Sequence, residues 1–394
     1  MKNSTLLLLI LSLLAIINSQ NFSQNNEAAN EQIFPGITHE KIINKKDKLV
    51  INILKIDLKN NNYEIEALKA NNLLKAKETT SEMSKRVSAE GTKVVAAVNA
   101  DFWLNDGEII NNMISNGNFV KAIADHSDDK LKRIFPQFAL TKDNKPLIDK
   151  FNFDGKLLLK NGIVEKISRI NSRTDSSSIT LYNYYQGEHS PKIRNGWKAL
   201  SAVLKPISSN NDTSFFIVSS EIINQSEIEI PKQGYVLSAS NNLADKLEKE
   251  ISVGDTVKVL LHFIPDEGKI YTLTGGLPQI VLNGKNLAAS SDTLEGTKPS
   301  FTVTKHPRTG IGFSKDSTTI YIFTVDGRQE SSSGMSLKEF ADLMIAHDVY
   351  QGLNLDGGGS TTMVIDGKLV NHPSDITGER PVGSCLLIVL KNKR

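Results

Sequence analysis

The sequence predicts an α+β fold in which a strand-rich mixed sheet is accompanied by a few helices. Short segments of alternating apolar and polar residues, separated by turn residues, occur along most of the chain, which is typical of strands. The helical patterns lie between strands but do not alternate with them as in a doubly wound sheet. Because 39% of the residues are apolar and 23% are charged, the chain can bury one large core or two moderate ones.

The N-terminal region carries the features of an export signal followed by a leader. A basic start precedes an apolar stretch from Leu6 to Ile17, which as a helix would be roughly 18 Å long and too short for the ~30 Å hydrocarbon core of a membrane. We therefore expect residues 1–20 to be a signal peptide, with no transmembrane span after its removal. Residues 21–35 are rich in Asn, Gln and Ser, which predicts a flexible leader before a single domain over residues 36–394.

The start of this domain predicts two strands, a helix and a third strand. Residues 49–58 and 63–68 alternate in polarity and indicate two strands joined by a turn, and residues 79–88 indicate a short helix. Val94 to Val98 form an apolar run of strand length. Since polar residues just beyond a buried strand commonly face a cleft, Asn99 to Trp103 are candidates for a site.

The middle segment, about residues 135–270, is predicted to be rich in strands. It consists of short alternating runs separated by turn residues, and one helical pattern occurs at residues 242–249. The last third contains the clearest helix, from Ser336 to about His347, because Ser336 and Glu339 have the spacing of a capping box. Apolar strands are expected around it, at residues 319–325, 352–355 and 362–365.

Composition and spacing exclude several classes of function. The formal charge of +2 arises from 46 basic and 44 acidic residues without a long basic run, so no nucleic-acid partner is expected. The only cysteine, Cys385, lies in an apolar strand and is expected to be a buried, inert thiol. The histidines lack the spacing of a zinc site, so no cofactor is expected to be required. Calcium bound by Asp101, Asp106 and Asp356 is left open, although their spacing is not that of an EF-hand.

A glycine-rich loop after an apolar strand is the strongest local motif. Asp356 is followed by Gly357, Gly358, Gly359, Ser360 and Thr361. Glycines allow successive N–H groups to converge on an anion, and the hydroxyl groups can add donors, so the loop predicts a phosphate site. On these residues alone, a flexible hairpin is the competing interpretation, because glycine clusters are common in turns.

Three arginines at the boundaries of predicted elements are the second signal. Arg308 precedes one strand, Arg328 follows the next strand in the run Asp326-Gly327-Arg328, and Arg380 follows Glu379 near the end of the chain. Guanidinium groups suit bidentate contacts with phosphate or carboxylate, so their convergence would favour an anionic ligand. For each arginine taken alone, a structural salt bridge is the alternative.

The motifs of the chain, taken in order, resemble those of the phosphodiester glycosidase family. They are Asn99 to Trp103, Gly275 to Pro278, Leu282 to Lys285, His306 to Gly312, Thr324 to Arg328, Ser333 to Leu337, Leu353 to Ser360, Asn371 to Asp375 and Glu379 to Val382. The resemblance extends over about residues 90–390 and is much weaker in the middle segment. It departs at Asp101, where the family often reads Asn-Gly-Gly-Phe-Phe across the first motif, and the added carboxylate could alter substrate choice or metal binding.

This resemblance implies a phosphodiester-glycosidase-like domain and hydrolysis of a sugar 1-phosphodiester; the family's animal member removes N-acetylglucosamine from a phosphodiester on mannose. Departure from the anomeric carbon builds oxocarbenium character, which calls for a carboxylate, and the leaving phosphate calls for positive charge. The implied roles follow from these needs. Asp326 or Asp356 would stand at the reacting carbon, Glu379 would be an acid or base, Asn99 and Asp101 would position the sugar, and Arg308, Arg328, Arg380 and residues 357–361 would bind the phosphate.

Two other functions remain compatible with the same residues. A glycosidase acting on exported polysaccharide would use the carboxylates but would not need the arginines. A non-catalytic surface module that binds phosphorylated glycans would use the glycine loop and the arginines as a static anion site. The enzyme is favoured because acids and arginines on separate loops exceed what anion capture requires. The export signal leaves periplasm, cell surface and medium as alternative locations.

Overall fold

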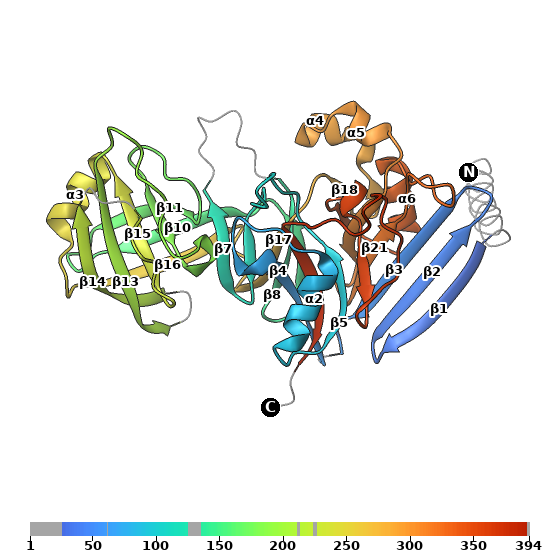
Figure 1. Ribbon diagram of the computed structural model, residues 1–394, viewed down its shortest axis with the longest axis horizontal. Coiled ribbons are helices and arrows are strands. Elements are labelled where there is room, and N and C mark those ends of the chain that lie inside the picture. Colours follow the sequence, from blue (N-terminus) through green and yellow to red (C-terminus); the bar gives the residue numbers. More distant parts are fainter. Residues whose placement is uncertain (1–25, 61, 125–134, 211–212, 224–226, 392–394) are drawn as a thin grey trace, which may run out of the picture.

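The computed structural model describes residues 26–391 except residues 61, 125–134, 211–212 and 224–226 (Figure 1). The expected signal peptide at residues 1–20 and the start of the expected leader lie outside the described residues. Within the described part of the chain, none of the helices has the length and hydropathy that a membrane crossing requires. The molecule is elongated, with one lobe built from the middle segment and the other from the two ends of the chain (Figure 1).

Two sheets stack in the lobe that contains both ends of the chain. The 8-stranded sheet has the order β1-β2-β3-β21-β20-β22-β18-β19, and the 5-stranded sheet has the order β24-β23-β5-β25-β4. The strands of the first are β1 (Asn26–Phe34), β2 (Ile37–Asn44), β3 (Leu49–Asp57), β21 (Thr319–Val325), β20 (Arg308–Phe313), β22 (Gln351–Asn354), β18 (Gln279–Leu282) and β19 (Lys285–Asn286). Those of the second are β24 (Lys368–Leu369), β23 (Met363–Ile365), β5 (Val94–Asn99), β25 (Ser384–Leu390) and β4 (Tyr63–Lys69).

The other lobe is formed by a 12-stranded sheet. Pairing of β10 with β11 closes part of it into a ring of β10, β16, β14, β13, β15, β12 and β11, and β7, β6, β17, β8 and β9 continue it toward the first lobe. The ring strands are β10 (Asn152–Leu158), β16 (Thr256–Ile264), β14 (Thr213–Ile223), β13 (Ala199–Asn210), β15 (Tyr235–Ser240), β12 (Ile179–Tyr182) and β11 (Val164–Ile170). The others are β7 (Asn118–Ile123), β6 (Met113–Ser115), β17 (Ile270–Gly275), β8 (Gln137–Thr141) and β9 (Pro146–Asp149).

Helices cover the outer faces of the two stacked sheets. Helix α6 (Leu337–Ala346) packs on the 8-stranded sheet through Phe340 and Met344, and α2 (Thr80–Ala89) packs on the 5-stranded sheet through Met83 and Val87. Between the sheets lies a third apolar layer, to which Ile56, Leu353 and Leu386 belong. The remaining helices are α3 (Asn242–Glu250) on the ring lobe and the short α4 (Ser291–Glu295) and α5 (Pro299–Val303). Single 3-10 turns occur at Ala70–Asn72, Tyr184–Gln186, Ala288–Ser290 and Gly358–Ser360.

The predicted fold class is confirmed, as are most of the predicted elements. The capping box of α6 is formed, since Ser336 Oγ accepts from the Glu339 amide and the Glu339 carboxylate accepts from the Ser336 amide. The strand predicted at residues 319–325 is β21, and the helix predicted at residues 242–249 is α3. Cys385 is fully buried, and this burial raises the pKa of its thiol.

Two expectations about the N-terminal part are wrong. Residues 26–34 were expected to belong to a flexible leader but form β1, which pairs antiparallel with β2. Strands pair through backbone N–H and C=O groups, so a segment of polar residues can also form a strand. Phe34, the last residue of β1, packs against the core. The strands at residues 49–57 and 63–69 do not form a hairpin. β3 pairs with β2 and β21, whereas β4 pairs with β25 in the other sheet.

Candidate active site

The candidate site lies where several strands of the two stacked sheets end. β20 runs antiparallel between β21 and β22, with Arg308 opposite Val325 and Gly310 opposite Asn354. The start of β20 therefore meets the ends of β21 and β22, so the loops after Val325 and after Asn354 lie side by side. The end of β5 joins them, because the Asp356 amide donates to the Ala100 carbonyl (2.9 Å).

The glycine loop is a tight turn rather than an open nest of amides. The Gly358 amide donates to the Pro307 carbonyl (2.9 Å), and the amides of Ser360 and Thr361 donate to Gly357 and Gly358 (3.2 Å each). Gly358 has φ of 62°, a conformation that favours glycine. The expectation that successive amides converge on an anion is therefore wrong for these three, because each is already bonded within the protein.

Two arginines lie directly over the glycines. A Cβ built on Gly358 would lie 3.2 Å from Arg328 Nη2, and one on Gly359 would overlap Arg380 Nη2. Arg380 also forms a two-fold contact with Asp375, from Nε to Oδ2 (2.7 Å) and from Nη2 to Oδ1 (2.9 Å). The absence of side chains on these two glycines thus allows the guanidinium groups of Arg328 and Arg380 to lie against the loop that follows Asp356.

Asp356 is partly exposed, and the indole of Trp103 holds its carboxylate. Trp103 Nε1 donates to its Oδ2 at 3.1 Å. Burial raises the pKa of Asp356 to about 6, and the nearby Ser360 hydroxyl, the Trp103 indole and the Arg380 charge oppose that rise. Ser360 Oγ is fully buried and forms no hydrogen bond. Its effect on the pKa of Asp356 therefore comes from its short distance to the carboxylate. A pKa of about 6 makes the ionised form of Asp356 the major form at neutral pH, although burial opposes that ionisation.

His306 lies beside Arg328 and has a defined protonation state. Its Nδ1 is 3.1 Å from Arg328 Nη2. Because a guanidinium can only donate, Nδ1 must accept, which leaves the proton on Nε2 of a neutral imidazole. Burial and the charges of Arg308 and Arg328 lower the pKa of His306, which favours the same neutral form. Arg328 and His306 together present N–H donors next to the glycine loop.

Asn99 is buried beneath this loop and does not reach a ligand position. Its Nδ2 donates to the Asp356 carbonyl (2.6 Å), and its Oδ1 accepts from Thr309 Oγ1 (2.9 Å) and the Thr362 amide (3.0 Å). The expectation that Asn99 contacts the sugar is wrong. Its side chain is fully buried, and its amide group is hydrogen-bonded to residues at the ends of three other strands. The Ser360 and Thr361 side chains are likewise buried, so their predicted role as phosphate donors is not supported.

Asp101 is also turned inward. It is 2% exposed, and its carboxylate accepts from the Asn111 amide (3.0 Å) and from Asn111 Nδ2 (2.7 Å). Burial raises the pKa of Asp101 to about 7 against the hydrogen bonds from Asn111. The expected contact of Asp101 with the sugar is therefore wrong, and the side chain instead anchors the loop that carries Trp103.

Arg308 is a structural residue in spite of its place in the motif. It is 2% exposed, with Nε donating to Met335 O (2.9 Å) and Nη2 donating to Phe301 O (3.1 Å) and Thr304 O (3.0 Å). Burial lowers the pKa of Arg308 to about 10. The expectation that Arg308 binds phosphate is wrong, because its donors hold the segment that contains α5.

The two other predicted carboxylates have protein partners. Asp326 is 3% exposed and accepts from Asn371 Nδ2 (3.2 Å) and the His372 amide (3.1 Å), and burial raises its pKa. Glu379 Oε1 accepts from the Ser81 amide (2.8 Å) at the start of α2. Asp326 thus fixes the loop at residues 371–372, Glu379 caps a helix, and neither has a contact with the glycine loop that would support a catalytic role.

The structure adds two residues that the sequence interpretation did not place in the site, His306 and Asp375, and it gives Trp103, a candidate from the sequence, a contact with Asp356. Each of these residues lies in one of the motifs named in the sequence analysis, but the kind of amino acid did not show what it contacts in the site. An aromatic residue after a strand is commonly part of the core, and Trp103 does pack against the core while its Nε1 reaches Asp356. Their partners come from distant parts of the chain, so no local pattern could identify them.

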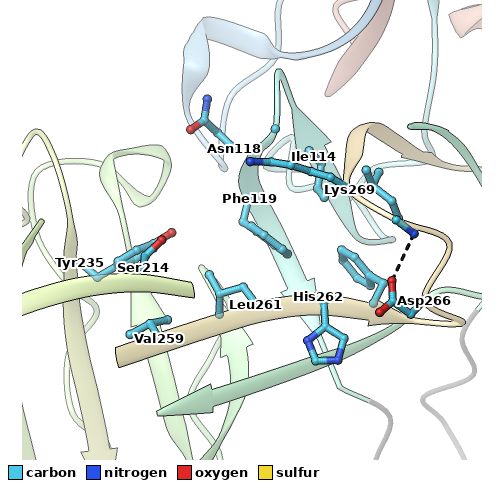
Figure 2. A pocket seen from close by; sticks show the side chains of 14 residues that line it. Ile114, Asn118, Phe119, Ser214, Tyr235, Val259, Leu261, His262, Asp266 and Lys269 are labelled. Atoms are coloured by element: carbon cyan, nitrogen blue, oxygen red, sulfur yellow. Dashed lines mark hydrogen bonds between the residues drawn. The ribbon is translucent and has the colours of Figure 1, made fainter. Parts of the chain in front are cut away.

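Among the described residues, no cluster of metal-binding side chains coincides with these residues. In the described part of the chain, no group of three or more His, Cys, Asp or Glu side chains is arranged to hold a metal ion. Asp101, Asp106 and Asp356, the carboxylates considered above for Ca²⁺, are not arranged as such a group. One cavity of about 220 Å³, lined by Phe119, Tyr235 and other residues, lies in the ring lobe and contains none of the predicted site residues (Figure 2).

Comparisons with known proteins agree with this fold. Residues 208–389 match the phosphodiester glycosidase family, so the matched region begins inside the middle segment. N-acetylglucosamine-1-phosphodiester alpha-N-acetylglucosaminidase of Mus musculus is 33% identical over 110 residues, 26% of this chain and 21% of that protein. The chain therefore matches only about a fifth of the length of this relative.

Two solved structures are similar over most of the chain. A hypothetical protein from Synechocystis has a TM-score of 0.71 at 18% identity, over 93% of this chain and 64% of that one. A putative exported protein from Burkholderia pseudomallei has a TM-score of 0.64 at 22% identity, over 86% and 74%. At these identities the similarity concerns the fold.

Proposed function

Because residues 208–389 match the phosphodiester glycosidase family, we propose that this protein is an exported hydrolase that cleaves the bond between a sugar's anomeric carbon and phosphate. The observation that carries the proposal is the placement of Arg328 and Arg380 over the glycines that follow Asp356. Arg380 lies close enough to Asp356 to lower its pKa, and Arg328 lies against Gly358, so this loop carries both charges that the reaction requires. Export is supported by the signal-like N-terminus and by the description of one structural relative as a putative exported protein.

Asp356 is the carboxylate that we place at the reacting carbon. When the bond from the anomeric carbon to the phosphate oxygen breaks, its electron pair leaves on the phosphate and positive charge develops on the sugar ring. An ionised carboxylate can form the new bond to that carbon or can take a proton from an attacking water. Asp356 suits either role because it is partly exposed and its pKa is about 6. Asp326, in contrast, is buried and bonded to Asn371 and His372.

The arginines are placed at the leaving phosphate. A phosphate monoester is a weak base, so neutralising its charge contributes more than protonating it. Arg328 lies against Gly358, and among the described residues its guanidinium has no acidic partner. His306, which contacts Arg328 through Nδ1, adds a neutral N–H donor at Nε2. Arg380 is paired with Asp375, which fixes its orientation and leaves Nη1 for a ligand. With this arrangement a phosphodiester should be preferred over an uncharged glycoside.

The test is turnover of a panel of sugar 1-phosphodiesters, including N-acetylglucosamine 1-phosphodiesters, by the purified protein and by Asp356→Asn. The Asn side chain keeps an acceptor for Trp103 Nε1 but cannot ionise, so we expect kcat to fall by about 10²–10⁴-fold. Asp366→Asn, in an exposed turn, is the matched control and should retain normal turnover. A folded Asp356→Asn protein with nearly full activity would rule out this role.

Aryl glycosides that lack phosphate separate the proposal from the alternative glycosidase. If they are hydrolysed as readily as the phosphodiesters and Arg328→Gln has no effect on either, the enzyme acts on ordinary glycosides. If phosphodiesters bind without any release of sugar, at several pH values and with or without Ca²⁺, the protein is a binding module. Released sugar in the presence of a chelator would show that no calcium is needed.

A further inference from the structure

A second hollow lies in the ring lobe, far along the chain from the glycine loop. It has a volume of about 80 Å³ and is lined by residues of β12, β13, β15 and the segments before β12 and β13. Its buried floor includes Tyr182 and Ser240, whose hydroxyl groups are bonded to Thr174 Oγ1 (2.7 Å) and Asp175 O (2.7 Å). The floor is therefore rigid and polar.

The rim of this hollow is cationic. Arg173, Lys192 and Arg194 all line it and are exposed, and no acidic side chain does. Among the described residues, neither Arg173 nor Arg194 has a carboxylate partner. Lys192 has only a 3.9 Å contact with Glu227 between two exposed side chains, which contributes little. Two guanidinium groups thus border one small hollow without a counter-charge.

An aromatic surface accompanies these charges. Trp197 lines the hollow and is partly exposed, and the guanidinium carbon of Arg194 lies 5.3 Å from the centre of its ring. This contact places a positive charge beside an indole ring. Arg194 covers one face of the ring, and the opposite face also carries partial negative charge, to which the C–H groups of a sugar ring are complementary. The cavity in Figure 2 differs, because it is lined by the acidic Asp266 as well as by His262 and Lys269 and so has no excess of positive charge.

We propose that this hollow binds the anionic group of a glycan, with that group between Arg173 and Arg194 and a sugar ring against Trp197. A space of about 80 Å³ accommodates a phosphate or a carboxylate and part of a ring, since one water needs only ~10–15 Å³ by the same measure. The anion follows from the arginines, whereas a sugar as its carrier rests on the proposed function. The ring lobe would then hold an anionic glycan while the glycine loop acts on another part of it.

Trp197 itself provides the readout. The chain contains two tryptophans, so Trp103→Phe leaves Trp197 as the only indole. Fluorescence of this protein is titrated with maltotetraose that carries a terminal 6-phosphate, with maltotetraose that ends in glucuronate, with unmodified maltotetraose and with inorganic phosphate. We expect saturable binding of one or both anionic oligosaccharides and binding of the neutral one and of phosphate alone that is at least about tenfold weaker.

Charge removal completes the test. Arg173→Gln with Arg194→Gln should weaken binding of the anionic oligosaccharide by about tenfold or more, whereas Lys249→Gln with Lys285→Gln, which removes the same charge from exposed positions outside the hollow, should not. Equal binding of neutral maltotetraose, equal binding of phosphate alone, or unchanged affinity in the arginine variant overturns the proposal. Because no probe contains a 1-phosphodiester, the result does not depend on whether the glycine loop is catalytic.

Discussion

Trp103 and Asp356, which are 253 positions apart, are joined by a hydrogen bond of 3.1 Å from the indole Nε1 to Oδ2 of the carboxylate. Trp103 follows β5 in the 5-stranded sheet, and Asp356 follows β22 in the 8-stranded sheet. The bond therefore links the two stacked sheets at the point where we place the reaction. It also stabilises the ionised form of a carboxyl group whose burial opposes ionisation.

Trp103→Phe should shift the acidic limb of the pH–rate profile. The variant removes a donor to the ionised carboxylate, so the pKa of Asp356 should rise further above its present value of about 6. The protein must then reach a higher pH before Asp356 ionises, and we expect the limb to move up by about one pH unit. The measurement is kcat/KM for a sugar 1-phosphodiester from roughly pH 4 to pH 8, a range that spans this pKa. The control is Tyr350→Phe, at the opposite end of β22, and an unshifted limb in Trp103→Phe would contradict the assignment.

Gly359→Ala should lower activity without unfolding the protein. The new methyl group would overlap Arg380 Nη2 and Asp375 Oδ1, which are the ends of side chains and can move away. The displaced guanidinium would lose its position at the phosphate, so we expect a fall in kcat/KM of about tenfold and a loss of less than about 1 kcal/mol in the free energy of unfolding. Gly162→Ala, where no atom lies within 4 Å of the new Cβ and only the φ of 85° strains the side chain, serves as the control for activity. Full activity of Gly359→Ala would show that Arg380 does not act here.

Arg328→Gln should reduce kcat/KM for the phosphodiester by about 10²-fold, because one preorganised charge at the leaving group is lost. The side chain is on the surface, so urea unfolding should show little change in stability. The comparison variant is Lys305→Gln, which removes an exposed charge from an ion pair with Glu339. An equal loss of activity in both variants would point to a general effect of charge rather than to contact by Arg328.

Arg308→Gln should show the opposite pattern, a loss of stability. The guanidinium donates to the backbone carbonyls of Met335, Phe301 and Thr304, which Gln cannot all satisfy. Leaving buried acceptors unpaired should lower the free energy of unfolding by about 2–4 kcal/mol, measured by urea titration. Stability close to that of the unmodified protein would contradict the structural role that we assign to Arg308.

Asp101→Asn should change the pH dependence of stability. The pKa of Asp101 is about 7 in the folded protein and about 3.9 in an unfolded chain, so the folded state binds more protons between these values. The contribution of Asp101 to stability is therefore fully present at low pH and lost as the pH rises through this window. The Asn variant lacks that loss, so its stability relative to the unmodified protein should increase between roughly pH 4 and pH 7.

Asp106→Asn on the same loop is the matched control for this prediction. Asp106 is exposed, and the Glu108 amide and Lys75 lower its pKa. Its contribution to the stability of the folded protein therefore appears as the pH rises. The stability of Asp106→Asn relative to the unmodified protein should accordingly fall with rising pH, opposite to Asp101→Asn. Urea titrations at several pH values measure both differences. The same trend for both variants would show that burial does not set the ionisation of Asp101.

The fold could be predicted largely because it depends on local patterns. The strand at residues 319–325 is encoded by its run of apolar and β-branched residues, and the start of α6 is encoded by Ser336 and Glu339. The edge strand β1 escaped prediction because its polar residues give no apolar pattern and its pairing with β2 uses the backbone.

The site could be predicted in its main parts but not in its contacts. The sequence by itself determined that Asp356, the three glycines, Arg328 and Arg380 are present at the ends of predicted strands. Only the tertiary structure decided that Asn99, Asp101 and Arg308 point inward, while Trp103 and His306 take places in the site. The reason is physical. Whether a segment forms a strand depends on residues next to one another in the sequence. The partner of a polar side chain depends instead on how distant strands pair, because their register decides which strand ends lie together.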